Sequence, residues 1–79
     1  METVILIGHA EWNGECFDFK IGEWVGGIGL MMRRSGHGSS KETGAGTWPS
    51  IEKAQSIADQ TVRRLLNPEC SVTWTVASE

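Results

Sequence analysis

The sequence predicts an α+β fold in which one helix packs on a four-stranded, mainly antiparallel sheet. Three observations lead to this fold class. An Asn-Gly pair at residues 13–14 separates two apolar-rich runs, apolar residues recur at helical spacing over residues 51–66, and residues 71–76 alternate between apolar and polar. A chain of 79 residues is short enough to form a single domain, residues 1–79, in the order β-β-β-α-β.

The first two strands form a hairpin around Asn13-Gly14. Asn-Gly is the preferred pair for a type I′ turn, because both central residues of that turn need positive φ. A two-residue loop fixes the register, so that Trp12 faces Glu15 and His9 faces Asp18. Because side chains alternate along a strand, this register gathers one set of mostly apolar residues from both strands on a single side, which we expect to face the helix. These residues are Val4, Leu6, Gly8, Ala10, Trp12, Phe17, Phe19 and Ile21.

The third strand is expected at residues 24–34. A turn at Gly22-Glu23 would precede it, with glycine in the first central position as a type II′ turn requires. This turn places Ile21 opposite Trp24 and Phe19 opposite Gly26. Residues 35–47 contain four glycines and no large apolar side chain, so they predict a flexible Gly/Ser-rich loop.

A helix and a last strand complete the chain. Ser50 is the expected N-cap, and Asn67-Pro68 ends the helical pattern. The first strand carries four consecutive apolar residues at 4–7, which is typical of a strand in the interior of a sheet. We therefore place the last strand, residues 71–76, beside the first. The predicted strand order is 4-1-2-3, which leaves the third strand at an edge.

Composition excludes several classes of protein. Apolar residues at 39% and charged residues at 22% are typical of globular domains, and a net charge of −3 does not favour a protein that coats DNA. Two cysteines are too few for a disulfide scaffold. The sequence contains neither a signal-peptide pattern nor an apolar run long enough to span a bilayer, so we expect a cytoplasmic protein without a membrane partner.

The residue types of a catalytic or metal site are present without a recognised motif. His9 faces Asp18 in the expected hairpin, and Cys16 lies on the same face two residues from Asp18. An imidazole beside a carboxylate orients many catalytic dyads, but an open sheet face supplies neither a pocket nor an oxyanion donor. His37 and Cys70 are further candidate ligands, yet no two of these residues have a recognised metal-ligand spacing. We predict no catalytic residue, no metal and no cofactor, and interpret His9 and Asp18 as an exposed cross-strand pair.

The leading functional prediction is a non-enzymatic protein-interaction module that uses the edge strand 24–34 to bind either a second copy of itself or another protein. This strand carries no charge between Trp24 and Met32, although edge strands are usually protected by charge or proline. Glycines on its outer face would leave a shallow apolar strip suited to a second copy or to another protein. The predicted partner-binding residues are Val25, Gly27, Gly29 and Met31.

The alternative prediction is a weak nucleic-acid or phosphate-binding domain that uses the basic, glycine-rich segment 33–41. Glycine-rich backbone can hold an anion, and nearby cations strengthen its binding. The segment does not match the phosphate-loop motif. The predicted anion-binding residues are Arg33, Arg34, His37 and Lys41.

Overall fold

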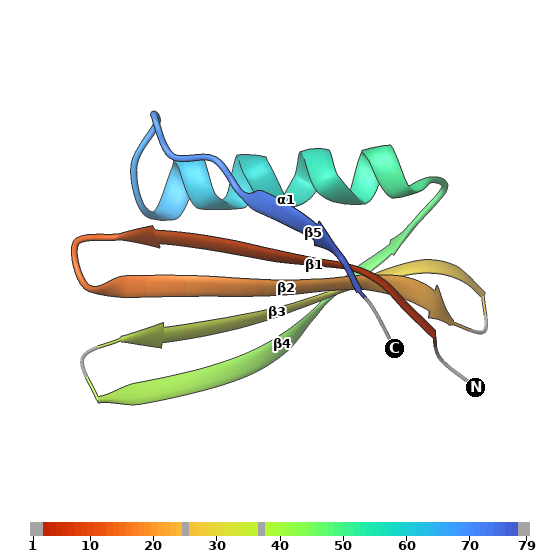
Figure 1. Cartoon of the computed structure of the whole chain (residues 1–79), viewed down its shortest axis with the longest axis horizontal. Helices are drawn as coiled ribbons and strands as arrows, with labels where there is room; N and C mark the ends of the chain where they lie inside the picture. The colour runs from red at the N-terminus through yellow and green to blue at the C-terminus, as the bar shows by residue number, and fades with distance from the viewer. Residues whose placement is uncertain (1–2, 25, 37, 78–79) are drawn as a thin grey trace.

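The computed structural model describes residues 3–24, 26–36 and 38–77, and it confirms the α+β class. One helix covers one face of an antiparallel sheet (Figure 1). The sheet has five strands rather than four, in the order β4-β3-β2-β1-β5. The elements are β1 (Thr3–Trp12), β2 (Glu15–Trp24), β3 (Gly27–Gly36), β4 (Ser39–Trp48), α1 (Ile51–Leu65) and β5 (Thr73–Val76).

The first hairpin has the predicted register from Leu6 to Trp12, but an irregularity between Val4 and Leu6 shifts the pairing by one residue, so that Val4 pairs with Gly22 instead of Glu23. Trp12 pairs with Glu15 and His9 pairs with Asp18. Asn13 and Gly14 have φ values of 53° and 84°, as the type I′ turn requires. The last strand lies beside the first as expected, since Gly8 of β1 pairs with Trp74 of β5.

The second turn differs from the prediction. The strand β2 continues through Gly22 to Trp24, so Ile21 pairs with Leu30 and Phe19 pairs with Met32. The register is therefore displaced by six residues from the expected one. Because six is an even number, the side chains expected on the helix-facing side of β3 remain there. Leu30 is buried in the core, and Met32 packs against it.

Within the segment predicted as a loop at residues 35–47, Ser35 and Gly36 instead complete β3, and residues 39–47 form most of β4. The strand β4 pairs with β3 along its length, with Met32 opposite Thr43 and Arg34 opposite Lys41. Residues 27–34 of the predicted edge strand 24–34 thus belong to an interior strand, Trp24 belongs to β2, and the two edges of the sheet are β4 and β5. Main-chain hydrogen bonds hold β4, and its end is anchored where the partly buried Trp48 packs against the core.

The core lies between the helix and the sheet. Ser50 caps α1 by accepting a hydrogen bond from the backbone N–H of Lys53 at 3.2 Å. The small side chains of Ala54 and Ala58 are fully buried, so the helix approaches the sheet closely. The buried core residues are Ala10, Phe17, Phe19, Ile21, Leu30, Ala54, Ala58, Val62 and Val72.

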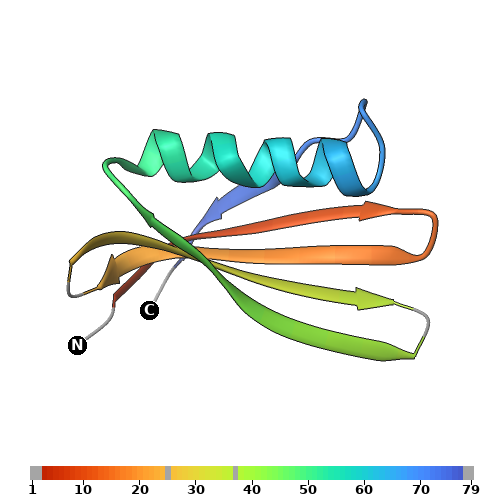
Figure 2. The same cartoon turned by 180° about the vertical axis from the view of Figure 1, so that it is seen from behind.

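The helix does not cover the whole sheet. At the end of the sheet that holds the Asn13-Gly14 turn, the β3–β4 hairpin diverges from α1 (Figures 1 and 2). This divergence exposes part of the helix-facing side of the sheet. Within the described part of the chain, no helix has the length and apolar character needed to cross a membrane.

Candidate functional site

Two surfaces carry chemically useful groups, one on each face of the sheet. The first is the outer cluster, which comprises His9, Glu11, Cys16 and Asp18 on the face away from the helix. His9 and Glu11 are two residues apart on β1, and Asp18 and Cys16 lie directly opposite them on β2. The type I′ turn therefore brings four side chains to one face of the hairpin.

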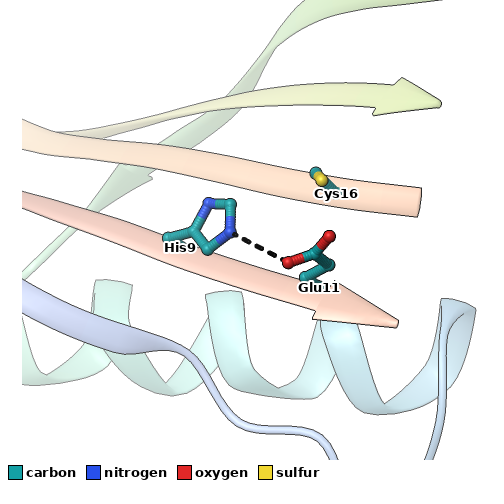
Figure 3. A group of neighbouring side chains, drawn as sticks. All are labelled: His9, Glu11 and Cys16. Atoms are coloured by element: carbon teal, nitrogen blue, oxygen red, sulfur yellow. Dashed lines mark ion pairs between the residues drawn. The ribbon is translucent and has the colours of Figure 1, made fainter. Parts of the chain in front are cut away.

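The imidazole of His9 is oriented by Asp18. Its Nδ1 lies 2.7 Å from Oδ1 of Asp18. A carboxylate can only accept a hydrogen bond, so Nδ1 carries the proton in this contact. When the ring is neutral, its Nε2 therefore presents a lone pair. That nitrogen lies 4.0 Å from Oε1 of Glu11, with Cys16 on the neighbouring strand (Figure 3).

In the absence of a metal ion, the Cys16 thiol stays protonated. Partial desolvation raises its pKa, and the nearby carboxylates of Glu11 and Asp18 raise the pKa further. A protonated thiol is a poor nucleophile. The surroundings of Cys16 therefore give no support to nucleophilic catalysis by a Cys-His-Asp set.

The second surface is the helix-side groove, an open cavity of about 430 Å³ between the end of α1 and the β3–β4 hairpin. Phe17 and Met32 contribute apolar lining from the sheet, and the exposed Leu65 contributes apolar lining from the helix. The full lining is Glu15, Phe17, Met32, Arg34, Ser35, Gly36, Lys41, Thr43 and Leu65.

Arg34 is held against the wall of this groove. Its Nη2 and Nε donate to Oε1 of Glu15 at 2.7 and 3.0 Å. Its guanidinium carbon also lies 5.5 Å from the centroid of the Phe17 ring, over the face of that ring. Lys41 lines the same groove and has no ion-pair partner among the described residues.

The three predicted anion-binding residues that the structure describes, Arg33, Arg34 and Lys41, lie on two faces of the sheet. Arg33 and Arg34 are neighbours on β3 and so project from opposite faces of the sheet. Arg33 lines a second cavity of about 200 Å³ on the outer face, where Asp18 and Glu42 are also found. Arg34 and Lys41 share the helix-side groove. His37 lies outside the described residues.

The predicted partner-binding residues are also redistributed. Val25 lies outside the described residues, while Gly27, Gly29 and Met31 belong to an interior strand. Met31 does line the outer cavity with Ile7, whose side chain is 45% exposed. The predicted apolar strip is therefore present in part, but the edge of β3 that was expected to be free is paired with β4.

Sequence reasoning missed the groove and one member of the outer cluster. The groove depends on Lys41 and Thr43 of β4, a strand that has no apolar pattern to reveal it. Glu11 could have been found, because the hairpin register places it directly opposite Cys16. A search for fixed motif spacings overlooks such cross-strand neighbours.

No protein-family model matches the chain. No curated protein and no solved structure matches it either.

Proposed function

We propose that this protein is a non-enzymatic interaction module that binds an acidic, partly apolar segment of another protein in the helix-side groove. The observation that carries this proposal is an open apolar lining flanked by cations. Leu65 is the last residue of α1, the helix that packs on the sheet, and yet it is 42% exposed. A side chain inserted beside it would bury apolar surface of both partners.

Charge complementarity selects an acidic partner. The lining contains two basic residues, Arg34 and Lys41, and one acidic residue, Glu15, whereas the whole chain has a net charge of −3. The groove is therefore more positive than the rest of the protein. Complementary potentials of this kind steer encounter and fix the orientation of a bound partner.

The groove favours a peptide over a polynucleotide. Glu15 already neutralises Arg34, so Lys41 supplies the unbalanced charge of the lining. Proteins that bind nucleic acid through its backbone usually contact several phosphates, and each contact needs a cation. An apolar pocket with a few charged groups at its rim instead suits a short peptide with one or two anchoring side chains.

The test is a titration of ¹⁵N-labelled protein with a blocked hexapeptide that has two leucines between pairs of glutamates. We expect shifts at the groove residues, with half-saturation below about 1 mM. Lys41→Glu should weaken binding about fivefold or more, because an attractive rim contact becomes repulsive. Lys20→Glu is the matched control, since Lys20 is exposed and lines the cavity on the opposite face.

Two results would overturn the proposal. Equally tight binding of a peptide with lysines in place of the glutamates would remove the argument from charge. A generic single-stranded oligonucleotide that binds more tightly than the peptide, with affinity falling steeply as salt rises, would favour the phosphate-binding alternative.

A further inference from the structure

We propose that the outer cluster is a Zn²⁺ site in which His9 Nε2, a Glu11 carboxylate oxygen and Cys16 Sγ are the ligands and Asp18 positions the His9 ring. This site lies on the face of the sheet opposite the helix-side groove. It is independent of the function proposed above.

The ligand atoms are already close together. One donor atom from each of His9, Glu11 and Cys16 lies within 4.8 Å of the other two. In a tetrahedral zinc site with bonds of about 2.0–2.3 Å, the donor atoms are about 3.3–3.8 Å apart. The side chains of His9 and Glu11 are 51% and 64% exposed, so small rotations can close the remaining distance without disturbing the core.

The backbone that carries these ligands is defined by the hairpin. His9 and Glu11 point to the same face because they are two residues apart on β1, and Cys16 is the cross-strand partner of Glu11. The two-residue turn fixes this pairing. Ligand groups held by paired strands lose less conformational freedom on binding an ion than groups on a loop would.

Asp18 supplies the feature that distinguishes this cluster from an ordinary cross-strand ion pair. Histidine ligands in metal sites almost always donate their second ring N–H to a carboxylate, a carbonyl or water. Asp18 takes this role at 2.7 Å from Nδ1, which leaves Nε2 on the side of Glu11 (Figure 3). The orientation of the ring and its tautomer are therefore those that a metal ligand needs.

The donor set selects the ion. One nitrogen, one sulfur and one oxygen suit Zn²⁺, whereas Mg²⁺ and Ca²⁺ require oxygen ligands throughout. The sulfur binds as a thiolate, so the bound ion displaces the Cys16 proton to solvent. Three protein ligands leave a fourth tetrahedral position, and the exposure of the cluster allows water to fill it. The cluster lies outside the hydrophobic core, so the fold does not depend on the ion.

The experiment is a titration of reduced, chelator-treated protein with Zn²⁺ in competition with a chromophoric chelator, and a parallel titration with Co²⁺. We expect one ion per chain and a thiolate-to-cobalt charge-transfer absorption. Cys16→Ser should abolish that absorption, and Glu11→Gln should weaken binding at least tenfold. Asp18→Asn should weaken binding about 10- to 100-fold while retaining the absorption, as expected of a positioning residue.

Cys70→Ser is the matched control, because Cys70 is the other free cysteine and is not part of the cluster. It should leave both the affinity and the absorption unchanged. The proposal would be overturned by loss of binding in Cys70→Ser, or by normal binding in Cys16→Ser. It would equally be overturned if Zn²⁺ shifted amide resonances of the wild type mainly outside residues 9–18.

Discussion

Gly8 is the position where adding one methyl group should be most informative about the packing of β5 on the sheet. Gly8 lies on β1 between Phe19 of β2 and Trp74 of β5. A Cβ atom at this position would meet Trp74 Cζ3 and Val72 Cγ1 at 2.6 Å each. Ordinary contacts begin at 3.4 Å, so both neighbours would have to move. We therefore expect Gly8→Ala to destabilise the protein.

The magnitude follows from two opposing effects. Overpacking a well-packed site costs about 1–3 kcal/mol. The tryptophan cannot retreat freely, because its ring packs on Phe19 with the centroids 6.1 Å apart. Replacing glycine by alanine also restricts the unfolded chain, which favours folding by about 0.4–1 kcal/mol. The expected net loss is about 1–2 kcal/mol, which corresponds to a fall in Tm of about 4–16 °C for a domain of this size.

Denaturant and thermal unfolding followed by circular dichroism measure this loss. Gly44→Ala is the matched control, because Gly44 also lies in a strand and its added Cβ would meet only Met31 Sδ, at 3.9 Å. This control should be neutral or slightly stabilising. The cost of Gly8→Ala should also be smaller in a Val72→Ala background, where one of the two close contacts is absent. A Gly8→Ala protein as stable as the wild type would refute the packing described for Trp74 and Val72.

Substitutions at three further positions test the core, the helix cap and the attachment of β5. Phe19→Ala should cost about 3–5 kcal/mol in unfolding experiments, because Phe19 is 1% exposed; a loss below about 1 kcal/mol would contradict its place in the core. Ser50→Ala should cost about 0.5–2 kcal/mol by removing the acceptor for the Lys53 N–H, and Ser50→Asp should retain most of the stability. Asp59→Ala should cost about 1–3 kcal/mol, because Asp59 Oδ1 accepts from the Val72 N–H at 3.0 Å; unchanged hydrogen exchange of the Val72 amide would argue against this contact.

The outer cluster is the part of the candidate chemistry that the sequence determines most directly. A two-residue turn leaves one register for its hairpin, so the local Asn13-Gly14 signal places His9 opposite Asp18 and Glu11 opposite Cys16. The distances among the side chains, and the hydrogen bond that orients His9, required the tertiary structure.

The helix and the last strand were also predictable, for a similar local reason. Ser50 caps the helix as expected, and the helical pattern ends before Asn67-Pro68. The spacing of apolar residues along the sequence indicates both the period of a helix and the alternation of a strand. Such patterns can be recognised without knowledge of the partner surface.

Only the tertiary structure decided the second turn and the strand β4. The expected turn at Gly22-Glu23 and the observed extension of β2 to Trp24 both place the apolar residues of β3 toward the helix, so the side-chain pattern could not distinguish them. The strand β4 has few apolar side chains and is held largely by main-chain hydrogen bonds to β3, which have no sequence signature. The helix-side groove depends on both features. The sequence therefore determined the elements whose geometry is local, while long-range backbone pairing determined the sheet edge and the groove.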